Sequence, residues 1–241
     1  MIRVVKVGGN VADDPHWVRS VAQGIAGTPT VLVHGGGRET SEVQRALGAE
    51  PEWRDGLRIT TPAALRALCM VLSGEVNKRW VSALLDAGID ALGLSGQDGA
   101  LLRARVACGG ARGRGGEITA VRSELLELLR DRGFVPVVSP VSRGADGGAL
   151  NVNADDAAVA IAAAIGAAEL LFVSDVSGVR SGEETLPQLD AAGAAALIAS
   201  GEATGGMVPK LRAATRAGIA AVRIGGPEML KNIEAGTRIT W

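Results

Sequence analysis

The chain has 241 residues, with 25 Lys and Arg against 26 Asp and Glu, a formal net charge of -1 and 47% hydrophobic side chains. This charge balance gives no general attraction to nucleic acid or to an anionic membrane, and the apolar fraction is that of a globular protein. The apolar stretches end before the roughly 20 residues that a membrane span requires. The N-terminus lacks the features of a signal peptide. We therefore expect no nucleic-acid partner, no membrane partner and a cytoplasmic location.

Short apolar segments rich in Val, Ile and Leu alternate with longer segments of helical period. Strands are expected at residues 2–7, 30–34, 91–94, 135–139, 169–174 and 220–224. Helices are expected at residues 15–25, 39–47, 62–87, 123–132, 154–165, 191–199 and 207–217. Thr61 is a candidate N-cap because Pro62 follows it. The alternation predicts the α/β class, with parallel strands covered by helices on both faces.

The region at residues 101–118 interrupts this alternation and is typical of a hairpin. Its turn is rich in glycine and arginine, and it contains Arg112 and Arg114. Two interpretations remain open for this turn. It is either a lid over a site or an exposed loop whose arginines keep it soluble.

Cysteine and histidine are scarce in the chain. Cys69 and Cys108 form no Cys-x-x-Cys pair, and two histidines are too few for a His-rich metal site. We expect both cysteines to be small buried residues. His34 lies at the end of a predicted strand, so we expect it to bind the backbone rather than to perform chemistry.

Two glycine-rich corners follow the first two predicted strands. Lys6-Val7-Gly8-Gly9 ends the first strand, and His34-Gly35-Gly36-Gly37 leads from the second strand into a helix. Bare backbone N–H groups at a helix start favour an anion, and Lys6 adds a charge. The alternatives are a tight turn beside a surface lysine and close packing of helix on strand. Neither corner matches a Walker A loop or the Gly-x-Gly-x-x-Gly spacing.

Polar residues at three further places suit an anionic small molecule. Arg58 follows a turn, and its planar guanidinium can bind a carboxylate, although alone it would be taken for a surface arginine. Asn153 is a candidate N-cap, but Asn151 and Asp155 exceed what one cap requires. Lys210 follows two glycines and is a second candidate for phosphate.

Together these motifs resemble those of a known family. They are Lys-Val-Gly-Gly, His-Gly-Gly-Gly, Gly-Leu-Arg-Ile-Thr, Val-Asn-Lys, Gly-Leu-Ser-Gly-x-Asp-Gly, Asn-Val-Asn-Ala-Asp, Ser-Asp-Val-Ser-Gly-Val and Gly-Gly-Met-x-x-Lys. Their order from residue 4 to the end of the chain is similar to that of the acetylglutamate kinases of the amino acid kinase family. The resemblance implies a three-layer αβα sandwich, with a central, mainly parallel sheet of about eight strands. It also implies one domain, with an N-terminal lobe at about residues 1–150 for the amino acid and a C-terminal lobe at about 151–241 for ATP.

The resemblance further implies a reaction and the residues that perform it. The γ-phosphoryl group of ATP would pass to the γ-carboxylate of N-acetyl-L-glutamate, in arginine biosynthesis. Lys6 and Lys210 would flank the phosphoryl group, and Asp155 would hold both lysines in place. The amino acid would be bound by four residues: Gly36, Gly37, Arg58 and Asn151. Arg58 and Asn151 would hold its α-carboxylate and nearby polar atoms, which keeps the γ-carboxylate in line.

The nucleotide site is implied in the same way. Its candidate residues are Gly8, Gly9, Asp175, Val176, Ser177, Gly178, Val179, Arg180, Glu202, Ala203 and Thr204. Mg²⁺ would arrive as Mg-ATP, coordinated mainly by phosphate oxygens, so we expect no dedicated metal site in the protein.

Several alternatives stay open on sequence alone. A homodimer built around the long helix that begins at Pro62 is expected, although Leu65, Leu68 and Leu72 could equally belong to an ordinary core. The acceptor could instead be N-succinyl-L-glutamate, or aminoadipate or glutamate linked to an acidic amino-group carrier protein. A non-catalytic sensor of amino acid or nucleotide is a further alternative, but pure binding does not require both phosphate-side lysines.

Overall fold

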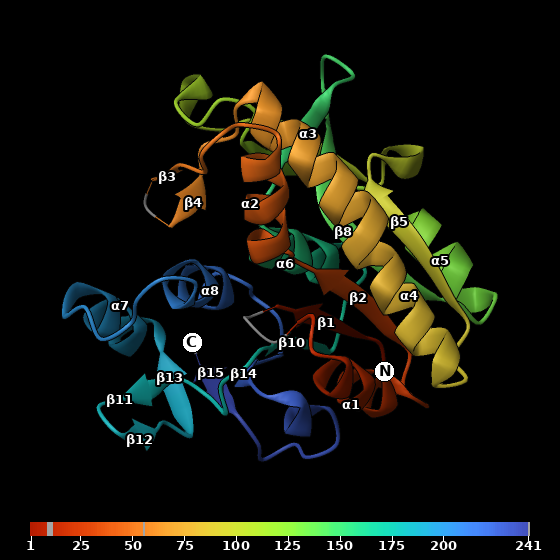
Figure 1. The fold of residues 1–241 in the computed structure, drawn as a ribbon. Helices are drawn as coiled ribbons and strands as arrows, with labels where there is room; N and C mark the ends of the chain where they lie inside the picture. Colours follow the sequence, from red (N-terminus) through yellow and green to blue (C-terminus); the bar gives the residue numbers. More distant parts are fainter. Residues whose placement is uncertain (9–11, 55, 241) are drawn as a thin grey trace.

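The computed structural model describes residues 1–8, 12–54 and 56–240. Its centre is a large twisted sheet with helices packed on both faces (Figure 1). The sheet strands are β1 (Arg3–Val7), β2 (Thr30–His34), β5 (Ala91–Gly96), β6 (Leu102–Val106), β7 (Gly116–Val121), β8 (Val135–Gly144), β9 (Ala149–Asn151), β10 (Glu169–Val173), β13 (Gln188–Asp190), β14 (Ala221–Gly225) and β15 (Thr237–Thr240). This is the three-layer α/β architecture that the sequence predicts.

The strand order places the first strand near the middle of the sheet. The order is β13-β15-β14-β10-β1-β2-β8-β6-β7, and β5 and β9 also pair with β8. The central pairs, from β14 through β10, β1 and β2 to β8, are parallel. Antiparallel pairs join β14 to β15, β6 to β7, and β8 to β9. Because the central strands are parallel, their carboxyl ends meet at one edge of the sheet, where ligands of such folds bind.

The helices form two layers, one on each face of the sheet. One layer contains α1 (Pro15–Ile25), α3 (Pro62–Met70), a π-helical segment η1 (Val71–Val76), α4 (Asn77–Asp86) and the short η4 (Pro227–Leu230). The other contains α5 (Ser123–Asp131), α6 (Ala154–Ala164), α7 (Ala191–Ala199) and α8 (Met207–Ala214). Helix α2 (Gly37–Ala46) packs against α3. Outside the layers lie two small hairpins, β3 (Trp53–Arg54) with β4 (Leu57–Arg58) and β11 (Arg180–Ser181) with β12 (Glu184–Thr185), and two short 3₁₀ turns, η2 (Asp98–Ala100) and η3 (Ala107–Gly110).

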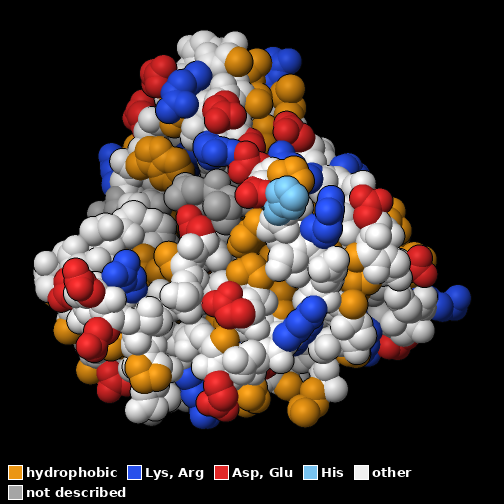
Figure 2. Space-filling view, turned by 60° about the horizontal axis from the view of Figure 1, so that its bottom comes forward, with side chains coloured by type: hydrophobic (Ala, Val, Ile, Leu, Met, Phe, Trp, Pro, Cys, Tyr) orange, Lys and Arg blue, Asp and Glu red, His pale blue; other side chains and the backbone are white. Residues whose placement is uncertain are grey.

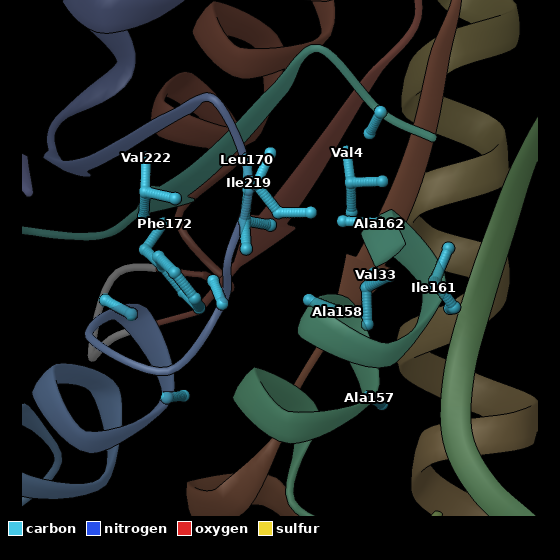
Figure 3. Close-up of a cluster of buried hydrophobic side chains, with 14 of the residues drawn as sticks. Val4, Val33, Ala157, Ala158, Ile161, Ala162, Leu170, Phe172, Ile219 and Val222 are labelled. Atoms are coloured by element: carbon cyan, nitrogen blue, oxygen red, sulfur yellow. The ribbon is translucent and has the colours of Figure 1, made fainter. Parts of the chain in front are cut away.

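Side-chain alternation along the strands divides the core in two. Val4 of β1 packs with α6, whereas Val5 and Val7 face the layer that contains α1 and α4. Figure 3 shows the α6 side, where Ala157, Ala158 and Ala162 lie against the strands. These small side chains let α6 approach the sheet closely, and this approach brings the start of α6 to the carboxyl end of β1.

All six predicted strands are confirmed within one or two residues at each end, except that β8 extends five residues further. The described residues form an eleven-stranded sheet, wider than the expected eight or so. The unpredicted strands β9, β13 and β15 are only three or four residues long and mix polar with apolar side chains. Such segments lack the apolar run that identifies a strand, and tertiary pairing determines their structure. The hairpin expected within residues 101–118 is confirmed as β6 and β7.

The long helix expected at residues 62–87 is confirmed, with a π-helical segment at its centre. Thr61 caps its start by accepting a hydrogen bond from the Ala64 N–H. Leu68 and Leu72 are 4% and 3% exposed, so both belong to the core of this chain. In the described part of the chain, no helix is both long and apolar enough to cross a membrane.

The expectation that both cysteines are buried is wrong for Cys108. Its side chain is exposed because Cys108 lies in the turn between β6 and β7, with a left-handed φ of 49°. Cys69 on α3 is half-buried, and burial raises the pKa of its thiol.

A buried hydrogen-bonded pair ties α4 to the sheet below the site. His34 is fully buried, and its Nδ1 donates to the Gly35 carbonyl at 2.9 Å. Its Nε2 accepts from Asn77 Nδ2, which also donates to the carbonyls of Leu94 and Val137. Burial lowers the pKa of His34 to about 4, so the ring is neutral at pH 7. His34 thus has the structural role expected from the sequence.

Replacing Asn77 should destabilise the fold. Asn77→Ala leaves a buried imidazole nitrogen and two carbonyls without their donor, and we expect the free energy of unfolding to fall by about 1–3 kcal/mol. Urea denaturation measures this change. Ser82→Ala, at an exposed position of the same helix, is the control and should stay within about 0.5 kcal/mol of the parent. Equal stability of the two variants would contradict the role assigned to Asn77.

Candidate active site

A cavity of about 510 Å³ opens at the carboxyl ends of β1, β2 and β10. Both halves of the chain line it, because the strand ends meet the starts of α2, α6 and α8 there. Of the residues predicted for the site, the cavity is lined by Lys6, Gly8, Gly36, Gly37, Arg58, Asn151, Asp155, Asp175, Val176 and Lys210. Positions far apart in the sequence therefore lie together at one place.

Three buried charged residues form the floor of the cavity. Asp155 Oδ1 lies 2.8 Å from Lys6 Nζ and 3.8 Å from Lys210 Nζ. The side chains of Lys6, Asp155 and Lys210 are 10%, 6% and 8% exposed. Burial alone would raise the pKa of Asp155, but the charges of Lys210 and Lys6 outweigh burial and lower that pKa. Asp155 is therefore an anion held between two cations.

The folding of three elements fixes this arrangement. Lys6 belongs to β1, which is hydrogen-bonded on both sides, and Lys210 belongs to α8. Asp155 lies in the first turn of α6, where Asn153 Oδ1 caps the helix by accepting from the N–H groups of Asp155 and Asp156. The cap predicted at Asn153 is thus confirmed, and it sets the position of Asp155.

Lys210 has the most perturbed amine of the site. Burial lowers its pKa to about 8, the charge of Asp155 opposes this effect, and repulsion from Lys6 adds to it. An ammonium group in this position gains most from a nearby anion, because burial has removed its water.

The glycines after β2 bring the backbone itself to the cavity. Gly36 has a φ of 155°, and a Cβ there would lie 2.7 Å from Leu72 Cδ2 and 3.1 Å from Val76 Cγ2. Both contacts come from side chains of the π-helical segment. A Cβ at Gly37 would meet nothing within 4 Å, so Gly37 faces open space at the start of α2. Backbone N–H groups at a helix start can bind an anion there.

Arg58 is buried in the wall of the cavity. Its Nη1 donates to Gln44 Oε1 at 2.8 Å, and its Nη2 donates to the Gly37 carbonyl and to Ser41 Oγ at 2.9 and 2.7 Å. The indole ring of Trp53 covers the guanidinium at 4.4 Å. Burial, with a smaller contribution from Arg45, lowers the pKa of Arg58 to about 10, so it remains charged at pH 7.

The glycine- and arginine-rich turn also belongs to the wall of the cavity. The Thr60 N–H donates to the Arg112 carbonyl, and the Arg114 N–H donates to the Thr60 carbonyl, at 3.0 and 2.9 Å. Asn151 Nδ2 donates to Thr60 Oγ1 at 2.9 Å, which links the turn to β9. Arg112 lines the cavity, whereas Arg114 pairs with Asp146. These backbone hydrogen bonds join the turn to the segment that carries Arg58.

The remaining nucleotide candidates that the structure describes do not line this cavity. Val179 is buried and its N–H donates to Thr237 Oγ1, while Glu202 accepts from Ser181 Oγ and the Gly182 N–H. The other candidates that lie outside the cavity lining are Ser177, Gly178, Arg180, Ala203 and Thr204. Gly9 lies outside the described residues. Among the residues that the structure places, no group of three or more His, Cys, Asp or Glu could hold a metal ion.

Sequence reasoning missed several side chains of the cavity wall. They include Trp53, Leu68, Leu72, Pro140, Met207 and Pro209. Glu39 and Thr40 also line the cavity, and their place directly after the three glycines is a sequence signal for this position. Leu68 and Leu72 carry no such signal, because only the tertiary packing of the long helix brings them to the site.

Comparison with known proteins places this geometry in a family. The profile of the amino acid kinase family matches residues 1–224. The chain belongs to the amino acid kinase family.

Individual family members are similar over nearly the whole chain. The acetylglutamate kinase of Roseiflexus castenholzii is 46% identical over 243 residues, covering 98% of this chain and 93% of its own. That of Methanopyrus kandleri is 45% identical over 226 residues, covering 90% of each chain. The crystal structure of smu.665 from Streptococcus mutans has a TM-score of 0.88 at 26% identity, covering 99% of this chain and 98% of that one. A carbamate kinase from Giardia, with a TM-score of 0.68 at 17% identity, covers 99% of this chain and 98% of its own and shares the fold.

The two glycines of this amino acid kinase corner should respond differently to a methyl group. In Gly36→Ala the new Cβ clashes with Leu72 and Val76 at an unfavourable φ, and we expect a loss of about 1–3 kcal/mol in unfolding free energy. Gly37→Ala points into open space, so its stability should change by less than about 1 kcal/mol. Thermal and urea denaturation compare the two. A Gly36→Ala variant as stable as Gly37→Ala would show that the corner tolerates a side chain.

Proposed function

We propose that the chain transfers the γ-phosphoryl group of ATP to the γ-carboxylate of N-acetyl-L-glutamate. The product is N-acetyl-L-glutamyl 5-phosphate, an intermediate of arginine biosynthesis. The observation that carries this proposal is the buried cluster of Lys6, Asp155 and Lys210 in the cavity. It is supported by 46% identity to a relative named acetylglutamate kinase, over 98% of the chain.

In the proposed reaction, the lysines stabilise charge on the transferring group. Phosphoryl transfer develops charge on the equatorial oxygens and requires little covalent work from the protein. Lys6 lies on the acceptor side and Lys210 nearer the leaving phosphates. Asp155 is a positioning residue that holds both ammonium groups at the cavity floor. Cations fixed in this way need little reorganisation when charge develops.

The acceptor occupies the N-terminal lobe, at about residues 1–150. The N–H groups of Gly36 and Gly37 bind the reacting end, and Arg58 and Asn151, which line the same cavity, hold the α-carboxylate and nearby polar atoms of the amino acid. Holding the γ-carboxylate in line with the phosphoryl group accounts for much of the rate acceleration. Leu68, Leu72 and Trp53 give the same cavity an apolar wall for the acyl group.

ATP occupies the C-terminal lobe, at about residues 151–241, with its phosphates toward Gly8 and Lys210. Asp175 and Val176 line the cavity, and the segments at residues 177–180 and 202–204 frame the nucleotide beyond it. Asp155 is already bound by two lysines, so Mg²⁺ enters with the phosphates of Mg-ATP, which supply most of its ligands. Bound there, the ion neutralises phosphate charge.

A homodimer through α3 and α4 is part of the proposal. Met70 and Leu85 on these helices are 52% and 50% exposed, although Leu68 and Leu72 belong to the core. An acidic carrier protein as the acceptor is less well supported. Lys, Arg, Asp and Glu side chains are interspersed on the face in Figure 2, which presents no broad basic surface.

Trapping of the product by hydroxylamine tests the reaction. With Mg-ATP, we expect hydroxamate chiefly from N-acetyl-L-glutamate, and less from N-succinyl-L-glutamate or free L-glutamate. A preference for the succinyl compound would keep the mechanism but change the acceptor. No hydroxamate from any of the three would overturn the proposed reaction and favour a carrier-linked acceptor or a sensor.

Neighbouring carboxylates on α6 allow a matched test of Asp155. Asp155→Asn leaves Lys6 and Lys210 without their anion, and we expect kcat to fall by about 100-fold or more. Asp156→Asn is the control, because Asp156 pairs with the exposed Arg216 instead and should retain kcat within about threefold. Circular dichroism establishes that both variants fold. Equal activity of the two variants would remove Asp155 from the site.

The lowered pKa of Lys210 predicts a pH dependence. Lys210 carries its charge below a pKa of about 8 and loses it above, so kcat/KM for Mg-ATP should fall as pH rises through about 8. The limit is about tenfold per pH unit. Lys210→Arg keeps its charge at every accessible pH and should lack this decline. A wild-type profile that stays flat to pH 10 would contradict the assignment.

A further inference from the structure

The peptide that joins Gly35 to Gly36 borders the cavity. Both glycines line it, and within the described part of the chain the Gly36 N–H forms no hydrogen bond. Neither residue has a Cβ, so the torsions on the two sides of this peptide lack the usual steric restraint. The peptide plane can therefore turn over at little steric cost, which would exchange the directions of its N–H and C=O groups. Its orientation depends on the hydrogen bonds that it forms.

A hydrogen bond from His34 holds the carbonyl of this peptide. His34 Nδ1 lies 2.9 Å from the Gly35 carbonyl oxygen, and the ring is fully buried between β2 and α4. Among the described residues, no backbone N–H donates to this carbonyl. The C=O and N–H groups of a trans peptide point in opposite directions, so the Gly36 N–H points away from the ring and from the α4 layer.

Asn77 determines which nitrogen of the His34 ring carries the proton. Asn77 Nδ2 lies 2.9 and 3.3 Å from the carbonyl oxygens of Val137 and Leu94, which only accept hydrogen bonds, so this group is the NH₂ of the amide. The same NH₂ lies 3.1 Å from His34 Nε2. An NH₂ group cannot accept, so Nε2 is the unprotonated nitrogen. A neutral imidazole has one N–H, which is therefore on Nδ1 and faces the Gly35 carbonyl.

The next peptide of the corner is held in the same manner but by another residue. The N–H and Oγ1 of Thr40 both donate to the Gly36 carbonyl, at 3.1 and 2.6 Å, and Thr40 is fully buried. This carbonyl shares a peptide with the Gly37 N–H, at the start of α2. The bond from the Thr40 N–H is an ordinary helical bond that any residue except proline would supply. The Gly35 carbonyl precedes the helix, so its orientation depends on the His34 side chain.

We propose that His34 is a positioning residue for phosphoryl transfer, and that it holds the Gly36 N–H toward the reacting group. This inference rests on the proposed function, in which the N–H groups of Gly36 and Gly37 bind the reacting end of the acceptor. His34 touches no ligand and acts only through the Gly35–Gly36 peptide. An N–H that is oriented before the reaction stabilises developing charge without reorganisation. The hydrogen bond between His34 and Asn77 thus serves the site as well as the attachment of α4 to the sheet.

Two substitutions of His34 separate its contact with Gly35 from its contact with Asn77. An asparagine side chain can donate from near the Nδ1 position to the Gly35 carbonyl, but it is too short to reach Asn77. A glutamine side chain can accept from Asn77 near the Nε2 position, but it leaves the Gly35 carbonyl without a donor. For His34→Gln we expect kcat with N-acetyl-L-glutamate to fall about 10- to 100-fold, and KM for Mg-ATP to stay within about threefold. His34→Asn should retain kcat within about fivefold, because it keeps the donor to Gly35.

A third variant controls for loss of stability. Val21→Ala removes buried methyl groups from α1, in the same helical layer, without changing a contact of the glycine corner. Its kcat should stay within about twofold of the wild type at a temperature where circular dichroism shows all variants folded. Equal kcat values for His34→Gln and His34→Asn would overturn the role proposed for His34. So would a fall in kcat for Val21→Ala as large as that for His34→Gln.

Nitrogen-15 NMR of the wild-type histidines tests the geometry without the reaction. The chain has two histidines, so substitution of the exposed His16 assigns the signals of His34. We expect the proton of His34 on Nδ1, and a proton on Nε2 would overturn the proposal even where His34→Gln does not fold. Failure of the proposed function is a separate result, in which the wild-type protein phosphorylates no acceptor. That result would overturn the positioning role as well, although the proton of His34 would still lie on Nδ1.

Discussion

The buried carboxylate of Asp155 is the interaction on which the site depends. Removing water from one carboxylate and two ammonium groups is costly, and the cost is offset only when the charges stay within a few ångströms of one another. Lys6, Asp155 and Lys210 come from a strand, a helix start and a second helix. The ion pairs therefore join distant parts of the chain, and they constrain how α8 can lie relative to β1.

The same edge of the sheet supplies the rest of the cavity for a geometric reason. Parallel strands end together, and the chain passes from each of them into a helix or loop at the same edge of the sheet. After β2 the chain turns through Gly36, where Leu72 and Val76 leave no room for a side chain. The π-helical segment, whose side chains fill that space, thus contributes to the site as well as to the core.

The sequence predicts correctly those features of the structure that a few neighbouring residues determine. The caps at Thr61 and Asn153, the apolar strands and the glycine corner after β2 follow from a few neighbouring residues, and the structure confirms them. The strands β9, β13 and β15, the exposure of Cys108 and the engagement of Arg58 Nη2 depend on partners far along the chain. Sequence spacing identified Arg58 as a cation suited to a carboxylate, but it could not show how many of its N–H groups were already used.

The buried cations of the cavity affect both the stability of the fold and the binding of anionic ligands. The negative charges of Asp155 and Asp175 both act on Lys210, and Asp155 also pairs with Lys6. Arg58 has no ion-paired carboxylate among the described residues. Burial lowers the pKa of Lys210 and of Arg58, because holding a cation away from water is costly. Phosphate and carboxylate groups of bound ligands bring negative charge to these cations, so they reduce this cost in the folded state alone. Ligand binding and stability of the cleft are therefore coupled through the same buried side chains.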